Sequence, residues 1–439
     1  MSQRKLIVSL SIAVLLAMTA GVSQGSVSRM EGMGLDVPLL SQFTDDYANI
    51  FWYPTSVVRQ NNLVLAELGN NGDNGGEVDE VDTADQTYTV IRNFPRLGAI
   101  AFQMAQTQND VFTGSGNLNN EQLDVIWGNA FSSFDFAVRF DMTQSTFEFE
   151  DDTPATVETS GLSALFNPFN PYPFGTFFPD AITDTGLEVN TWGITPAVAI
   201  HFGEDDRLEL AGTYRRFTFE RTDGPTPTET FEDAGNPSYA LLARAILHRG
   251  GTHTWFPAAW YVNDDLSYEV TGVLPGTVEV DETYRNMGIG ISDNMRVNDN
   301  NLLLWGITFA RAQREFERND TNVGGAPTDF AVAENSLTAM PLVFAAIETD
   351  ATRWLKLRIG ASRGRFVAKD ETTDFGAPSL TEETRTVFSD FNLGLGLGLR
   401  WSNLDIDMTL NEQFPLSGGW ILSGNSETPF NRVSATYHF

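Results

Sequence analysis

The chain has 439 residues, with 58 acidic residues against 27 lysines and arginines, a formal net charge of −31 and no cysteine. The missing basic footprint argues against nucleic acid as a partner. Disulfides and thiolate metal sites are excluded, and no motif indicates a cofactor or a metal.

The N-terminus has the layout of a secretory signal peptide. Arg4 and Lys5 precede an apolar run over residues 6–17, and the small residues of "SQG" (Ser23 to Gly25) suit cleavage before Ser26. We therefore predict a signal peptide over 1–25 and export of the mature chain. Because no later stretch approaches about eighteen uninterrupted apolar residues, only a barrel of strands could cross a membrane.

Residues 26–60 form a separate segment ahead of the first predicted strand. The segment resembles the opening of FadL-like and PorV-like outer-membrane barrels at Arg29, Met30, Gly32, Met33, Gly34, Asp45, Asp46, Asn49 and Trp52. It departs from them where Tyr53-Pro54-Thr55 replaces Asn-Pro-Ala. The resemblance implies that the segment folds into the lumen as a plug and that small or hydrophobic compounds pass around it. A disordered or periplasmic arm is the alternative.

Residues 61–439 alternate between apolar and polar with a period of two, which is the pattern of β-strands. We predict sixteen strands, at about 61–68, 86–92, 97–106, 122–131, 134–149, 189–203, 207–221, 237–249, 252–266, 281–297, 300–317, 335–348, 352–368, 384–401, 403–411 and 430–439. Fourteen would remain if the second and third runs stayed outside the wall. The connections are alternately very short and long, which is typical of an all-β, up-and-down outer-membrane barrel.

The stretch "FNLGLGLGLRW" (Phe391 to Trp401) shows the alternation most clearly. Its leucines would form an apolar face toward lipid, and its three glycines would keep the lumen side clear. A soluble sandwich could instead bury the leucines under a second sheet. The last residues favour the barrel, because a final strand closed by Tyr437 and Phe439 resembles the signal that the barrel-insertion machinery reads in outer-membrane proteins.

Two long loops carry unusual side chains. The loop at 165–180 combines four prolines with Phe166, Phe169, Tyr172, Phe174, Phe177 and Phe178. We interpret these aromatics as a hydrophobic entry platform or a constriction that binds a ligand, with self-packing against neighbouring loops as the alternative. The acidic loop at 71–85 is expected to be a solvated surface rather than a cation site, because it lacks the ligand spacing of an EF-hand.

Charged residues on the predicted inner face suggest a lumen of mixed charge. They are Asp135, Arg139, Asp141, Lys356, Arg358, Arg400, Asp405 and Asp407. Such residues tune ion selectivity in a water-filled channel, or they pair with each other and stiffen the wall.

An enzyme is not expected. The string "GASRG" around Ser362 fits the pattern of a nucleophile elbow, but it lies inside an alternating strand rather than at a strand-to-helix turn. We therefore expect an outer-membrane channel of a Gram-negative-type bacterium, surrounded by lipid and passing small solutes, with a leaning toward hydrophobic ones. The alternatives are a PorV-like accessory barrel in protein secretion or surface attachment and, less favoured, an outer-membrane lipid hydrolase.

Overall fold

The computed structural model describes residues 26–35, 38–60, 62–70, 84–109, 116–149, 186–203, 205–222, 230–233, 237–271, 276–322, 330–374, 380–410 and 430–439. The predicted signal peptide over 1–25 and the aromatic loop at 165–180 lie outside these ranges, as does nearly all of the acidic loop at 71–85.

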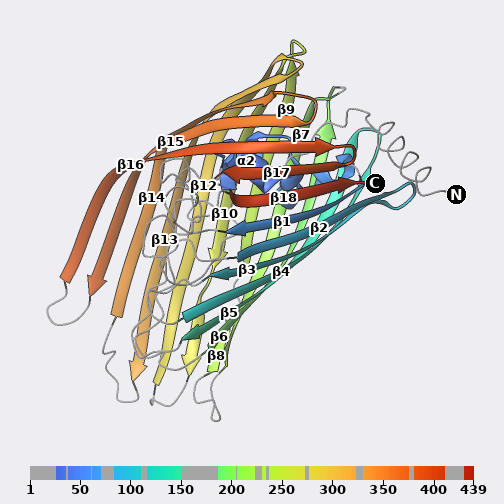
Figure 1. Ribbon diagram of the computed structural model, residues 1–439. Coiled ribbons are helices and arrows are strands. Elements are labelled where there is room, and N and C mark those ends of the chain that lie inside the picture. The colour runs from blue at the N-terminus through green and yellow to red at the C-terminus, as the bar shows by residue number, and fades with distance from the viewer. Residues whose placement is uncertain are drawn as a thin grey trace, which may run out of the picture.

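The described chain is built from strands, with four short helices near its start (Figure 1). The helices are α2 (Val27–Glu31), η1 (Pro38–Phe43), η2 (Tyr47–Phe51) and η3 (Pro54–Arg59). The strands are β1 (Leu63–Asn70), β2 (Ala84–Phe94), β3 (Gly98–Asn109), β4 (Gly116–Ala130), β5 (Phe134–Phe149), β6 (Gly186–His201), β7 (Arg207–Thr222), β8 (Thr230–Asp233), β9 (Ser238–Arg249), β10 (His253–Asp265), β11 (Tyr268–Thr271), β12 (Gly276–Asn298), β13 (Asn301–Asn322), β14 (Phe330–Asp350), β15 (Leu355–Asp374), β16 (Leu380–Trp401), β17 (Leu404–Leu410) and β18 (Phe430–His438). Among these residues, no helix is long and apolar enough to cross a membrane.

Each wall strand pairs antiparallel with its neighbours, and β1 closes the ring by pairing with both β2 and β18. The short strand β8 pairs with β11 just as β9 pairs with β10, and both β10 and β11 pair with β12. β8 and β9 are therefore two pieces of one wall strand, and β10 and β11 are two pieces of the next. The described wall has sixteen strand positions, as predicted, and β2 and β3 belong to it.

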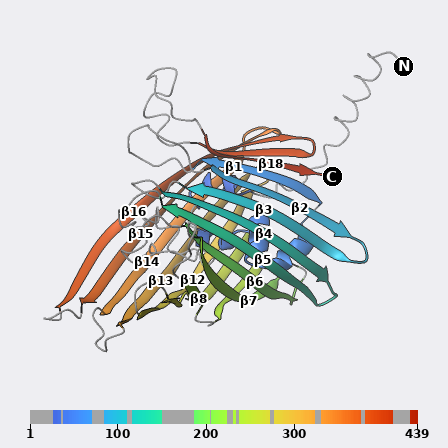
Figure 2. The ribbon, with the colours of Figure 1, turned by 90° about the horizontal axis from the view of Figure 1, so that it is seen from below.

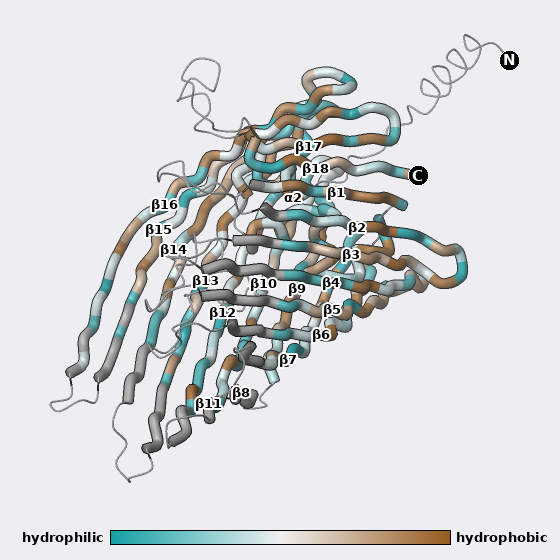
Figure 3. Tube along the Cα trace, turned by 60° about the horizontal axis from the view of Figure 1, so that its bottom comes forward, coloured by the Kyte–Doolittle hydropathy of each residue, from teal (hydrophilic) through white to brown (hydrophobic). Residues whose placement is uncertain are grey.

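Hydrophobic and hydrophilic residues alternate along the wall strands (Figure 3), and successive side chains of a strand point to opposite faces. On β6, the outward-facing Trp192 and Ile194 are 39% and 41% exposed, whereas the inward-facing Thr195 is fully buried. The stretch from Phe391 to Trp401 follows the same rule, because its leucines lie beside the exposed Leu357 and Ile359 of β15. All described strands form one closed sheet, so the soluble sandwich is wrong and the outer apolar face is that of a membrane barrel.

Several strands extend further than the sequence predicted. β12 begins at Gly276 rather than near 281, and β13 continues to Asn322 rather than ending near 317. The added residues are mostly polar, as in "EFERNDTN" at the end of β13. Apolar alternation therefore marks only part of each of these strands, because the backbone hydrogen bonds continue beyond the last apolar side chain.

Candidate functional site

The N-terminal segment (residues 26–60) lies inside the ring of strands, as Figure 2 shows from below. Its apolar side chains are buried, with Met33 1% exposed and Phe43 and Tyr53 fully buried. They pack against inward-facing side chains of the wall, including Trp260 and Phe344. Burial of this apolar area against the wall favours the docked position of the segment.

Glycines on both sides allow the segment and the wall to approach closely. A Cβ atom added to Gly396 of β16 would lie 2.9 Å from the Cα atom of Gly32. Gly34 has a φ of +67°, which other residues rarely adopt, and it packs against the backbone of Gly360 in β15. The glycines of "FNLGLGLGLRW" thus face the lumen as predicted, and Gly394 and Gly396 form the surface on which α2 lies.

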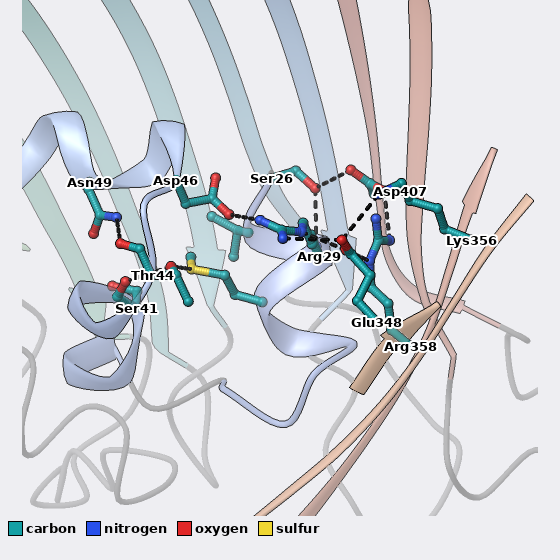
Figure 4. A network of polar contacts seen from close by, with 12 residues as sticks. Ser26, Arg29, Ser41, Thr44, Asp46, Asn49, Glu348, Lys356, Arg358 and Asp407 are labelled. Carbon is teal, nitrogen blue, oxygen red and sulfur yellow. Dashed lines mark hydrogen bonds and ion pairs between the residues drawn. The ribbon is translucent and has the colours of Figure 1, made fainter. Parts of the chain in front are cut away.

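A cluster of charges joins α2 to β14 and β15 (Figure 4). The Arg29 guanidinium donates to Asp46 at 2.9 Å and to Glu348 at 2.8 Å. Glu348 also accepts from Arg358 at 2.7 Å and from Lys356 at 3.1 Å. We call Arg29, Asp46, Glu348, Arg358 and Lys356 the Arg29 cluster.

Burial makes this cluster an effective link between the segment and the wall. The side chains of Arg358 and Asp46 are fully buried, and those of Arg29 and Glu348 are at most 10% exposed. Removing one member of such a buried pair leaves an uncompensated charge and costs about 3 to 5 kcal/mol. Burial raises the pKa of Asp46 to about 6, although the Arg29 guanidinium opposes this.

Wall arginines hold the opposite side of the segment. Arg244 of β9 donates to the backbone oxygens of Gln42 and Thr44, at 3.2 and 3.0 Å, and its guanidinium carbon lies 4.4 Å from the centre of the Tyr53 ring. Its charge is balanced by Glu209 of β7. These contacts satisfy carbonyl groups that the short helices leave unpaired within the lumen.

Two further arginines extend this pattern around the wall. Arg207 of β7 donates to both carboxylate oxygens of Asp45 at 3.0 Å. Arg139 of β5 donates to the backbone oxygen of Phe51 at 2.9 Å and to Asp124 at 2.6 Å. Contacts to the segment therefore come from β5, β7 and β9 as well as from β14 to β17.

The eight charges predicted for the lumen fall into three separate groups on the inner face. Arg139 lies 3.8 Å from Asp141, and nearby Asp135 pairs with Arg59 of the segment at 3.2 Å. Lys356 and Arg358 belong to the Arg29 cluster, and Arg358 also pairs with Asp407 at 2.7 Å. The third group is the pair of Arg400 and Asp405, at 3.1 Å. Six of the eight are buried, all except Lys356 and Arg400.

The other predicted site residues are placed as follows. The aromatic residues of the loop at 165–180 lie outside the described residues, so their role stays a prediction. Tyr437 and Phe439 are 51% and 48% exposed at the end of β18. Ser362 is buried within the continuous strand β15, paired with Phe344 and Asn392, so it does not occupy the sharp turn of a nucleophile elbow.

Sequence reasoning missed Glu348, Arg244 and Glu209. Each stands at an inward position, and Glu348 and Arg244 also lie among apolar residues, as in "FAAIETD" around Glu348. An isolated charge at such a position signals a buried partner, and this signal was available in the sequence. Within the described part of the chain, no group of histidine, aspartate and glutamate side chains could hold a metal ion.

The inner wall also carries an apolar lining on β10 and β12 to β16. It includes Trp260, Tyr284, Leu337, Phe344, Phe366 and Phe388. The rings of Phe366 and Phe388 stack with their centroids 5.4 Å apart, and Trp260 is anchored by a hydrogen bond of 2.9 Å to Asn286. A water-filled porin has a polar interior, so this part of the inner wall, which packs in one cluster with the N-terminal segment, differs from a porin wall.

An apolar groove of about 630 Å³ opens on the outer face of β6, β7, β9 and β10. Its lining includes the outward-facing Pro196, Gly212 and Leu241 together with Leu242 and Trp260, which face inward. The ladder between β6 and β7 is interrupted here, because its register passes from Ile194 and Tyr214 directly to Ala197 and Ala211. Proline lacks the N–H that the ladder needs, and a hydroxyl contact of 2.9 Å between Thr195 and Thr213 bridges the interruption.

The solved structures that are similar to the chain share little sequence with it. No protein-family model and no curated protein matches the sequence. A Pseudomonas aeruginosa FadL homologue is 10% identical with a TM-score of 0.46, covering 95% of this chain and 99% of that one. The ferric-catecholate import receptor Fiu from E. coli K12 is 9% identical with a TM-score of 0.35, covering 87% of this chain and 82% of that one. The ferric yersiniabactin uptake receptor FyuA from Yersinia pestis is 7% identical with a TM-score of 0.34, covering 87% and 80%.

Proposed function

We propose that the protein is an outer-membrane transport barrel of a Gram-negative-type bacterium, that it passes small hydrophobic solutes, and that the N-terminal segment acts as its plug. The observation that carries the proposal is the combination of an apolar inner lining with a segment that crosses the lumen. An apolar solute loses little when it moves along such a lining, whereas a sugar or an ion would lose hydration without gaining hydrogen bonds.

The groove beside Pro196 supports this class of solute. It connects outward-facing and inward-facing apolar side chains at an interruption of the ladder. A hydrophobic solute could pass there between the lumen and the bilayer core, and the polar groups at the interruption, the Thr195 and Thr213 hydroxyls, already bond each other. A polar solute would gain nothing from this route.

Uptake by intact cells tests the proposal. Cells that express the protein should take up a radiolabelled aromatic hydrocarbon faster than control cells and a disaccharide no faster. Gly212→Leu should fill the groove, because an added Cβ atom meets its nearest neighbour, Leu241, only at 3.6 Å, and it should lower hydrocarbon uptake about fivefold, or roughly 1 kcal/mol. Ala361→Leu, an outward position on β15, is the matched control.

Two results would refute the transport proposal. One is equal uptake of hydrocarbon and disaccharide, which would indicate an unselective pore. The other is no uptake of either solute by a barrel that copurifies with exported proteins, which would favour the PorV-like accessory function.

A further inference from the structure

The start of the N-terminal segment lies in a buried acidic site on the inner wall. Ser26, the first described residue, is fully buried. Its hydroxyl donates to Asp407 of β17 at 3.1 Å, and the adjacent backbone N–H of Val27 donates to Glu67 of β1 at 2.9 Å. The cross-strand register places Ser434 of β18 directly between these two carboxylates.

Among the described residues Glu67 makes no ion pair, and the charge that acts on it from further away is that of Arg432. Glu67 is 2% exposed, and its two oxygens accept from the Val27 N–H and from the Tyr47 hydroxyl, at 2.9 and 2.7 Å, both neutral donors. Arg432 of β18 makes its described ion pair with Glu31, at 2.9 Å, and not with Glu67. Within the described part of the chain, no cation lies within ion-pair distance of Glu67. A buried carboxylate without a cation is strongly unfavourable.

Ser434 gives a second and independent indication of a missing group. Its side chain faces the lumen and is buried, and its hydroxyl has no hydrogen-bond partner. Buried hydroxyl groups are nearly always satisfied in folded proteins. A donor is therefore expected between Glu67 and Asp407, and the properties required of it are a positive charge and several N–H groups.

We propose that this donor is the α-ammonium group of Ser26, which is freed when residues 1–25 are removed. The inference rests on the predicted signal peptide and not on the transport function. Hydrolysis of the Gly25–Ser26 bond by a signal peptidase consumes one water, leaves a carboxylate on Gly25 and creates an amine on Ser26. This amine is protonated at neutral pH, because the ordinary pKa of an α-amino group is about 8.

The covalent geometry brings the new charge to the site. Three backbone bonds separate the nitrogen of Ser26 from that of Val27, so the two atoms are less than about 4 Å apart. The ammonium group therefore lies within roughly 7 Å of the Glu67 and Asp407 carboxylates, with Ser434 between them. Processing of the leader thus creates the cation that fixes the start of the segment inside the barrel.

Reactivity of the α-amine tests the inference on the purified, folded protein. Reductive methylation with formaldehyde and cyanoborohydride near pH 7 should modify the Ser26 amine more than tenfold more slowly in the folded barrel than in the urea-unfolded chain. Glu67→Gln should raise the folded-state rate at least tenfold. Glu121→Gln, an exposed acid on the outward-facing side of β4, is the control and should leave the rate unchanged.

A second variant leaves every barrel residue intact in case Glu67→Gln fails to fold. One alanine inserted ahead of Ser26 moves the ammonium group by about 3.8 Å, and its reactivity should rise at least tenfold. Intact mass reports the cleavage site in each preparation. A mature chain that begins elsewhere than Ser26, an amine equally reactive in the folded and unfolded states, or an inserted alanine without effect would each overturn the inference.

Discussion

Neutralising Glu348 should release the N-terminal segment from the wall. Glu348 accepts from Arg29, Arg358 and Lys356, and its side chain is only 8% exposed. Each of these cations keeps a second acid, because Arg29 also pairs with Asp46, Arg358 with Asp407 and Lys356 with Asp350. We therefore expect Glu348→Gln to cost about 3 kcal/mol, the lower end of the range for breaking a buried ion pair.

Because the chain has no cysteine, a single introduced thiol reports on the docked state. Ser28→Cys is suitable, since Ser28 is fully buried and its hydroxyl has no hydrogen-bond partner. A loss of about 3 kcal/mol should raise the population of the undocked segment, and hence the rate of maleimide labelling of folded protein in detergent, about 100-fold.

Glu315→Gln provides the control for this experiment. Glu315 pairs with Arg285 at 3.0 Å, but the two side chains are 44% and 37% exposed. Such a pair contributes less than about 1 kcal/mol, so labelling should change less than about fivefold. Equal labelling rates in Glu348→Gln and the parent protein would show that the Arg29 cluster does not hold the segment.

Three further predictions use the same labelling assay or thermal unfolding. Gly396→Ala should destabilise docking by about 1 to 3 kcal/mol, because the new Cβ atom would lie 2.9 Å from the Cα atom of Gly32. Gly212→Ala is the control and should not change labelling, because the atom nearest to its new Cβ atom lies at 3.6 Å. Arg244→Ala should lower the thermal midpoint by calorimetry, since it removes one of the two arginine partners of the buried Glu209 and two bonds to segment carbonyls. A lysine at the same position should restore part of the loss, and an unchanged midpoint would contradict the structure. Burial raises the pKa of Asp46 from 3.8 to about 6, so between these pH values the docked state binds more protons than the undocked state. Docking should therefore become about tenfold tighter as the pH falls from 7 to 5. Asp46→Asn should abolish this difference when thiol labelling is compared at both pH values.

The wall could be predicted from the sequence because its determinants are local. Alternation along a strand, as from Trp192 to Ile200, is visible within ten residues, and tight turns such as Gly250-Gly251 separate the strands. The interruptions that divide β8 from β9 and β10 from β11 were missed. The pieces Thr230–Asp233 and Tyr268–Thr271 have only four residues each, too few for a clear alternating pattern.

The position of the N-terminal segment could not be predicted in the same way, because it depends on contacts between distant residues. Arg29 meets Glu348, which is 319 residues away, and Ser26 meets Asp407, which is 381 residues away. The individual charges on β15 and β17 were found by their inward parity. The residues that pair with these charges could not be predicted, because odd or even position along a strand gives the face of a side chain but not the residue that meets it across the lumen.

The pairing of β1 with β18 has a consequence for how the chain reaches this state. The seam joins Leu63 to His438, so the ring cannot close until the last residues have been exported. Long sequence separation between partners slows folding, and an open sheet exposes unpaired edges that associate with other chains. We expect the polypeptide to require a holding chaperone on its way to the membrane. The period in which its strand edges are unpaired should end when β18 pairs with β1.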